Sequence, residues 1–81
     1  MITEPLILIV DDNPKNLQVL GNYLQIEGYL VEFAMNGESA IEWASRKEFD
    51  LILLDIMMPG MDGFEVCGII KSGHVNQKTP V

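Results

Sequence analysis

Leu51-Ile52-Leu53-Leu54-Asp55-Ile56-Met57-Met58-Pro59-Gly60-Met61-Asp62-Gly63 is the stretch that decides the fold. Its four consecutive aliphatic residues have no polar face, which predicts a strand buried on both sides of a parallel sheet. The run ends at Asp55, at the carboxyl end of the strand, where open α/β sheets place their chemistry. Pro59 and Gly60 suit the two central positions of a type II turn, which folds the backbone back over the strand end. The stretch therefore predicts a carboxylate at the end of a rigid strand, with backbone carbonyls directed at the same place.

The chain is short and acidic, with 81 residues and a formal net charge of −7. A domain of this length buries only about 60% of its unfolded surface. No apolar run approaches the roughly 20 residues of a membrane span and no signal peptide precedes Leu6, so neither a membrane segment nor secretion is expected. The single cysteine, Cys67, fits a reducing compartment, the cytoplasm. The excess of acids argues against nucleic-acid binding by this segment, because phosphate contacts need lysine and arginine.

The beginning of the chain repeats the pattern of the central stretch. Leu6–Val10 is a second aliphatic run that predicts a doubly buried strand, and it also ends in acids, Asp11 and Asp12. Asn13 is a good helix N-cap, and Pro14 suits the first helical position, where its missing N–H costs nothing. The residues that this helix is expected to turn inward are Leu17, Leu20, Gly21 and Leu24, and its expected stop is Gly28.

Strands and helices continue to alternate along the rest of the chain. Leu30–Ala34 predicts an edge strand, and Asn36-Gly37 predicts a turn or cap before a second helix. Asp62 and Glu65 have the spacing of a capping box for a third helix from about residue 64 to residue 72. The second helix is expected to turn Ala40, Ile41 and Ala44 inward. The third helix is expected to stop at Gly73. Residues 74–79 are then expected to form a loop, and Pro80-Val81 to begin another strand.

This order predicts an α/β fold with a doubly wound parallel sheet in three layers, incomplete and with strand order 2-1-3. The strands that end in Asp11-Asp12 and in Asp55 then lie side by side at the topological switch point, about 4.8 Å apart. Two carboxylates about 5 Å apart repel each other by about 3 kcal/mol at an effective dielectric constant near 20, which favours recruitment of a cation. A few hard oxygen ligands with room for water and phosphate describe a Mg²⁺ site. Taken singly, Asp12 and Asn13 are equally well explained as helix caps.

Three motifs together resemble the receiver domain of two-component response regulators. They are Leu8–Asn13, Asp50–Asp55 and Met58–Gly63, and the resemblance extends from about Leu6 to Val81. It implies a flavodoxin-like fold and phosphorelay signal transduction, in which the receiver accepts a phosphoryl group from a sensor histidine kinase or a phosphotransfer protein and regulates an output.

The resemblance also implies a role for each acid of the predicted cluster. Asp55 would be the phospho-acceptor, whose carboxylate attacks a phosphohistidine of the partner to form an acyl phosphate. Mg²⁺ would be held by Asp12, Asp55 and the backbone carbonyl of Met57, with Asp11 acting largely through water. The implied role is signalling rather than enzymatic turnover, apart from self-phosphorylation and slow self-dephosphorylation.

The sequence departs from the family pattern at its end. Family members continue through two more strand-helix units, which carry a Ser or Thr and a Lys that contact the phosphoryl group. Thr79, Lys71 and Lys78 do not match these positions. Residues 1–81 are therefore expected to be the N-terminal part of a receiver domain. The third strand then becomes an unprotected edge, which predicts a homo-oligomer formed through Leu51–Leu54.

Two other functions compete with the receiver. A Mg²⁺-dependent phosphohydrolase of the haloacid-dehalogenase type also uses a strand-end aspartate, but it needs a second aspartate two positions on, where this chain has Asn13 and Met57. A receiver-like scaffold that binds partners without taking phosphate is the other. The sequence does not identify the output domain or the cognate kinase.

Overall fold

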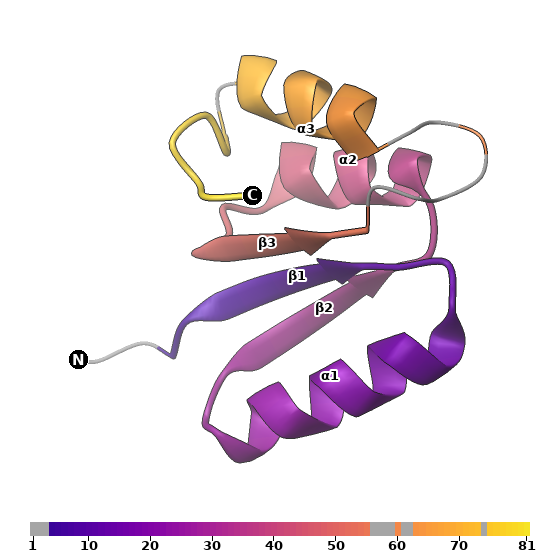
Figure 1. The fold of residues 1–81 in the computed structure, drawn as a ribbon. Helices are drawn as coiled ribbons and strands as arrows, with labels where there is room; N and C mark the ends of the chain where they lie inside the picture. Colours follow the sequence, from indigo (N-terminus) through magenta and orange to yellow (C-terminus); the bar gives the residue numbers. More distant parts are fainter. Residues whose placement is uncertain (1–3, 56–59, 61–62, 74) are drawn as a thin grey trace.

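A computed structural model of the chain describes residues 4–55, 60, 63–73 and 75–81. Three parallel strands form one sheet in the order β2-β1-β3, with α1 on one face and α2 and α3 on the other (Figure 1). This arrangement confirms the predicted α/β class and strand order. The elements are β1 (Leu6–Val10), α1 (Pro14–Ile26), β2 (Leu30–Ala34), α2 (Gly37–Arg46), β3 (Leu51–Leu54) and α3 (Gly63–Ser72).

The strand β1 lies at the centre of the sheet and of the core. Its residues from Ile7 to Val10 are buried, as the continuous aliphatic run predicts. In the register of the sheet, Val10 lies beside Leu54 of β3 and beside Ala34 of β2. The carboxyl ends of β1 and β3 therefore meet at the same edge of the sheet, which brings the acids that follow them together.

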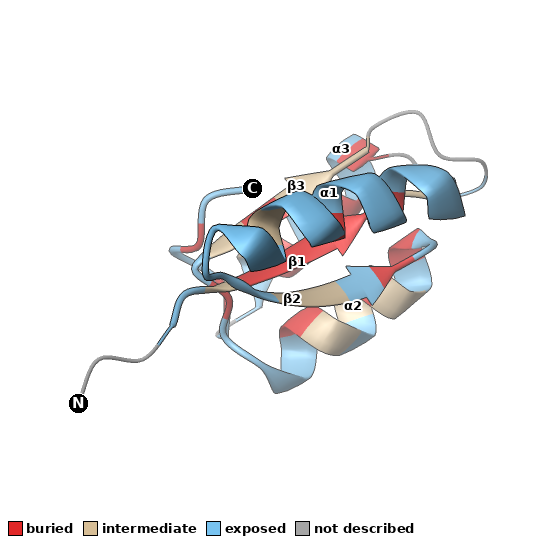
Figure 2. Cartoon of the chain, turned by 90° about the horizontal axis from the view of Figure 1, so that it is seen from below, coloured by how far each residue is buried: buried red, intermediate tan, exposed pale blue. Residues whose placement is uncertain are grey.

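The prediction that β3 is buried on both sides is wrong for most of the strand. Only Ile52 is fully buried, whereas Leu51, Leu53 and Leu54 are half-buried. Figure 2 shows the contrast between the buried β1 and the half-buried β3 beside it. The reason is that α1 packs mainly against β1 and β2, so that little of this chain covers β3 on the α1 face.

Local hydrogen bonds explain where α1 begins and ends. The Asn13 side chain accepts a hydrogen bond from the backbone N–H of Lys15 at 2.9 Å, which confirms Asn13 as the N-cap. At the other end the N–H of Gly28 donates to the carbonyl of Gln25, and the N–H of Tyr29 donates to that of Leu24. These two bonds form a Schellman motif, and Gly28 supplies the positive φ of 96° that the motif requires.

The other two helices also follow the predictions closely. Asn36 caps α2 by accepting a hydrogen bond from the N–H of Ser39 at 2.7 Å, and Ala40 and Ala44 are buried against the sheet. The α3 helix begins at Gly63, one residue before the predicted start. Gly60 has a φ of 85°, as the second central position of a type II turn requires. The rest of that turn and the predicted cap Asp62 lie outside the described residues.

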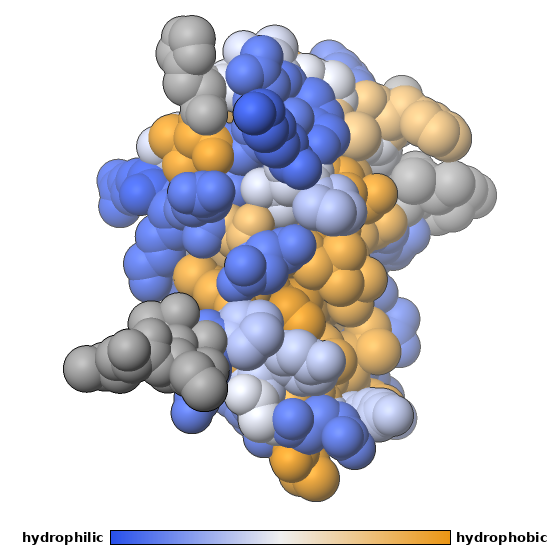
Figure 3. Space-filling model, turned by 90° about the vertical axis from the view of Figure 1, so that its left-hand side faces the viewer, coloured by the Kyte–Doolittle hydropathy of each residue, from blue (hydrophilic) through white to orange (hydrophobic). Residues whose placement is uncertain are grey.

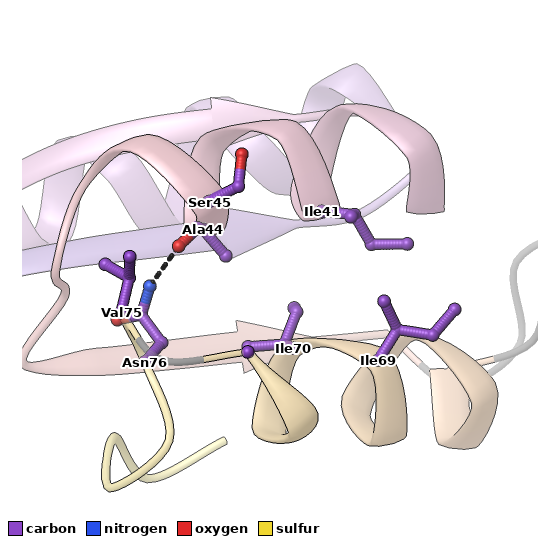
Figure 4. A pocket seen from close by; sticks show the side chains of 8 residues that line it. Ile41, Ala44, Ser45, Ile69, Ile70, Val75 and Asn76 are labelled. Carbon is purple, nitrogen blue, oxygen red and sulfur yellow. Dashed lines mark hydrogen bonds between the residues drawn. The ribbon is translucent and has the colours of Figure 1, made fainter.

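The segment after α3 is more ordered than the predicted loop. Asn76 is almost completely buried and fills the end of a hollow of about 370 Å³ between α2 and α3 (Figure 4). Its amide nitrogen donates to the carbonyls of Ala44 and Lys47, and its amide oxygen accepts from the N–H of Phe49 and the hydroxyl of Thr79. The Asn76 side chain thus joins this segment to the end of α2 and to the chain that leads into β3.

Pro80, next to the last residue, makes one backbone contact with β3. The carbonyl of Pro80 accepts a hydrogen bond from the N–H of Ile52 in β3 at 2.9 Å, although residues 80–81 form no regular strand. The predicted strand start at Pro80-Val81 therefore stays a prediction, with one backbone hydrogen bond to β3 in its favour.

Two glycines of the helices are expected to respond oppositely to alanine. A Cβ atom on Gly21 of α1 would lie 2.6 and 2.7 Å from ring atoms of Phe33, whereas one on Gly68 of α3 would meet nothing within 4 Å. We expect Gly21→Ala to lower the free energy of unfolding by about 1–3 kcal/mol because the ring must move. We expect Gly68→Ala to raise it by about 0.5–1 kcal/mol, since alanine is the better helix former. Urea unfolding of both variants measures the difference.

A second background separates the ring contact from a backbone effect at Gly21. When Phe33 is first replaced by leucine, Gly21→Ala should cost clearly less than in the wild-type chain. An equal cost in both backgrounds would show that the Phe33 ring is not the reason for glycine at this position.

Candidate metal centre

The structure brings the three predicted acids together. One carboxylate oxygen each of Asp11, Asp12 and Asp55 lies within 4.8 Å of the others. Two backbone hydrogen bonds hold the strand ends that carry them: the N–H of Asp55 donates to the carbonyl of Val10 at 3.0 Å, and the N–H of Asp11 donates to that of Ala34 at 3.1 Å. The cluster is thus fixed by the sheet itself, because both bonds continue the ladder of the parallel strands.

Two hydrogen bonds constrain the side chain of Asp11. Its Oδ1 accepts a hydrogen bond from the N–H of Asn13 at 2.9 Å, and its Oδ2 accepts one from the side-chain amide of Asn16 at 3.1 Å. Sequence reasoning missed Asn16, which lies on the first turn of α1 and reaches back toward the strand end. Its spacing of five residues from Asp11 belongs to no capping motif, so only the helix geometry reveals the contact.

The donor set fits a small, hard divalent cation. The oxygens are carboxylates, which Mg²⁺ prefers, and three of them leave room in an octahedral shell for water and a phosphoryl oxygen. Asp12 is exposed and Asp11 and Asp55 are half-buried, so the cluster is open to solvent on one side and backed by the sheet on the other. The hydrogen bonds to Asp11 are of the kind that orient carboxylates around a metal. Met57, whose backbone carbonyl is the fourth predicted ligand, lies outside the described residues.

Leu20 differs from its prediction in a way that bears on this site. It was expected to face inward, yet it is 40% exposed. It lines a hollow of about 450 Å³ together with Ile9 and Leu53, and the same hollow is bounded by Asp11 and Asp55. Leu20 lies on the flank of α1 that faces β3, where the described part of the chain supplies no further helix to cover it.

Comparison with known proteins identifies the family. The family model described as "Response regulator receiver domain" matches residues 7–81. The response regulator PleD of Caulobacter vibrioides is 47% identical over 75 residues, which are 93% of this chain and 16% of PleD. The histidine-protein kinase BarA of Escherichia coli is 44% identical over 75 residues, which are 93% of this chain and 8% of BarA. The chain belongs to the response regulator receiver domain family.

Solved structures agree with this assignment. The chemotaxis protein CheY4 of Vibrio cholerae superposes with a TM-score of 0.92 at 35% identity, over 96% of this chain and 65% of CheY4. The receiver domain of the sensor histidine kinase PA1611 from Pseudomonas aeruginosa, which holds a magnesium ion in its active-site cleft, gives a TM-score of 0.90 at 32% identity, over 96% of this chain and 64% of that one. A structure of the histidine kinase ThkA in complex with the response regulator TrrA gives 0.83 at 40% identity, over 93% and 63%.

The comparisons also show how much of the receiver fold this chain contains. It spans about 65% of the CheY4 chain and only small parts of PleD and BarA, so the three strands and three helices are incomplete relative to the full receiver fold. Among the described helices, none is both long and apolar enough to cross a membrane.

Proposed function

We propose that this chain is the acceptor half of a phosphorelay receiver, in which Asp55 takes a phosphoryl group from a phosphohistidine of a sensor histidine kinase or phosphotransfer protein. The observation that carries the proposal is the convergence of Asp11, Asp12 and Asp55 at the carboxyl ends of β1 and β3 in a chain of the receiver family. Residues 1–81 are the N-terminal part of the receiver domain, acting in the cytoplasm and regulating an output through a partner or a further domain. The net charge of −7 argues against binding of nucleic acid by this segment.

The proposed roles are those that the resemblance to receiver domains implies for these residues. A carboxylate oxygen of Asp55 attacks phosphorus in line with the leaving imidazole; a P–O bond forms, the P–N bond breaks, and the imidazole nitrogen keeps the electron pair. Asp12, Asp55 and the backbone carbonyl of Met57 would hold Mg²⁺, and Asp11 would act largely through water. When bound, the cation offsets negative charge on the phosphoryl oxygens. Since strand ends position Asp55, the protein contributes mainly placement and electrostatics, as phosphoryl transfer requires.

The phosphohydrolase alternative makes a different prediction for turnover. A hydrolase of the haloacid-dehalogenase type would need an acid at position 13, but Asn13 stands there and its side-chain oxygen is engaged with the N–H of Lys15. We therefore expect the chain, given Mg²⁺ and a small phosphodonor, to incorporate one phosphoryl group per molecule and to release phosphate only slowly. Intact-mass measurement and phosphate release, followed together, distinguish the two functions. Many phosphates released per chain would favour the hydrolase.

Self-association through β3 is a further part of the proposal. In the described part of the chain β3 is one of the two edge strands, and only Pro80 makes a backbone bond to its free edge. Figure 3 shows hydrophobic surface gathered along the right of the view, the side on which β3 lies. An exposed strand edge flanked by apolar side chains favours pairing with another chain.

The charge of the chain predicts how this association depends on salt. Two copies, each with a net charge of −7, repel each other, and added salt screens that repulsion. We expect the dimer fraction in sedimentation equilibrium to rise as NaCl is raised from low to near-molar concentration. A monomer at every salt concentration and at high protein concentration would rule out pairing through Leu51–Leu54.

A further inference from the structure

The first turn of α1 supplies a side chain that contacts the acidic cluster without belonging to it. The side-chain amide of Asn16 donates a hydrogen bond to Oδ2 of Asp11 at 3.1 Å, and the backbone N–H of Asn13 donates one to Oδ1 of the same carboxylate at 2.9 Å. Each bond holds one oxygen, so the Asp11 carboxylate can rotate only by giving up one of them. Asn16 therefore helps to decide how Asp11 faces the cation site.

The fold in turn holds Asn16 in place. Its backbone N–H and that of Leu17 both donate to the carbonyl of Asn13, at 3.1 and 3.2 Å, so Asn16 lies within the hydrogen-bonded first turn. Leu17, the next residue, is buried against the sheet beneath α1. The helix begins shortly after β1, the strand that leads into Asp11 (Figure 1). The amide is thus fixed relative to the strand end, as a group that orients a carboxylate at a metal centre must be.

The repulsion within the cluster gives this contact its importance. Asp11, Asp12 and Asp55 each bring a carboxylate oxygen to within 4.8 Å of the others, and like charges at that distance favour rotation of a side chain away from the cluster. One hydrogen bond adds only modestly to stability, but a donor on the charged Oδ2 opposes that rotation. A cation that enters the site then meets an Asp11 that is already oriented.

The orientation of Asp11 bears on which cation the site prefers. Mg²⁺ requires a near-octahedral shell and keeps several waters, whereas Ca²⁺ takes more oxygen ligands in a flexible shell and accepts carboxylates through both oxygens. A fixed Asp11 suits contact through water and hinders direct binding through both oxygens. An Asp11 that is free to rotate would be available to Ca²⁺ as an additional direct ligand.

We propose that Asn16 is a positioning residue of the metal centre, which holds Asp11 in the orientation for contact through water and so favours Mg²⁺ over Ca²⁺. This role rests on the proposed metal site but requires no phosphoryl transfer, so it can fail while Asp55 remains the acceptor. A merely structural contact would change the affinity for both cations alike, if it changed either. The ratio of the two affinities is therefore the decisive quantity.

Displacement of Mn²⁺ measures both affinities on the full 81-residue chain. Mn²⁺ prefers the same oxygen ligands, and electron paramagnetic resonance reports the free ion as Mg²⁺ or Ca²⁺ displaces it. We expect Asn16→Ala to weaken binding of Mg²⁺ about tenfold, the lower end of the usual range for a partner of a metal ligand, and binding of Ca²⁺ by no more than about twofold. Asn22→Ala is the matched control, because it removes another exposed asparagine amide from α1 and should leave both affinities unchanged. Circular dichroism and urea unfolding in EDTA check that both variants remain folded.

Two results would overturn the role of Asn16. One is an Asn16→Ala chain that binds Mg²⁺ as tightly as the Asn22→Ala chain does. The other is equal weakening for Mg²⁺ and Ca²⁺, which leaves the ratio of affinities unchanged. A wild-type chain that binds none of the three cations would overturn the metal centre itself, and the role of Asn16 with it. Since no phosphodonor is used, failure here and failure of Asp55 as the acceptor give separate results.

Discussion

Asp55→Asn is expected to abolish phosphorylation of this chain. Asparagine has nearly the same shape as aspartate but lacks the carboxylate nucleophile, so no acyl phosphate can form. After incubation with Mg²⁺ and a small phosphodonor, intact-mass analysis should show one added phosphoryl group on the wild-type chain and none on the variant. The loss should be complete. The neighbouring acids in the cluster are Asp11 and Asp12, and both are assigned to the cation rather than to the phosphoryl group.

Asp50→Asn is the matched control for this experiment. Asp50 precedes the same strand, β3, but at the opposite end, where its side chain accepts a hydrogen bond from the N–H of Leu6 at 2.7 Å. An asparagine oxygen can still accept that bond, so the fold is maintained and phosphorylation should equal that of the wild-type chain. Phosphoryl addition that persists in Asp55→Asn would contradict the assignment.

If the wild-type chain takes up no phosphate, the experiment is repeated with a longer chain. In the family, two further strand-helix units carry the remaining phosphoryl contacts, and a chain extended through them decides whether Asp55 is wrong or the 81 residues are insufficient. If the extended chain also remained unmodified, Asp55 would not be the acceptor.

Asn76→Ala is expected to have a large effect on stability. Its side chain makes four hydrogen bonds in a buried position, at 2.6–2.9 Å, to groups of α2, of the chain before β3 and of its own turn. Alanine would remove the side-chain partner of the carbonyls of Ala44 and Lys47 and of the N–H of Phe49, and it would open a small cavity. We expect a loss of about 3–5 kcal/mol in the free energy of unfolding, measured by urea titration, and a chain of this size has only about 4–12 kcal/mol to lose.

Two neighbours separate the hydrogen bonds of Asn76 from a general sensitivity of the segment. Gln77→Ala, at an exposed position, should change stability by no more than about 0.5 kcal/mol. Thr79→Val removes one buried hydroxyl that is bonded to Asn76 and Phe49, and it should cost about 1–2 kcal/mol. If Asn76→Ala unfolded at the same urea concentration as Gln77→Ala, the buried hydrogen bonds would not be what holds the segment in place.

The sequence predicts most of the elements because their determinants are local. Continuous aliphatic runs give the strands β1 and β3, and Asn13, Gly28 and Asn36 mark helix ends through bonds to residues two to four positions away. The convergence of Asp11, Asp12 and Asp55 is also predictable, because a doubly wound sheet whose winding reverses between the first and third strands places these strand ends side by side. The order of the elements, the winding of the sheet and the convergence of the three acids were thus determined by the sequence.

Tertiary structure alone decided what covers each element. The half-burial of β3 and the exposure of Leu20 depend on α1 packing over β1 and β2, and no pattern within either segment reveals that. The same holds for Asn76, which reads as part of a polar loop. It becomes the most connected buried side chain only because residues 27 to 32 positions away present their backbone groups to it. The burial of a side chain depends on the residues that pack around it, and for these residues those neighbours are distant in the chain.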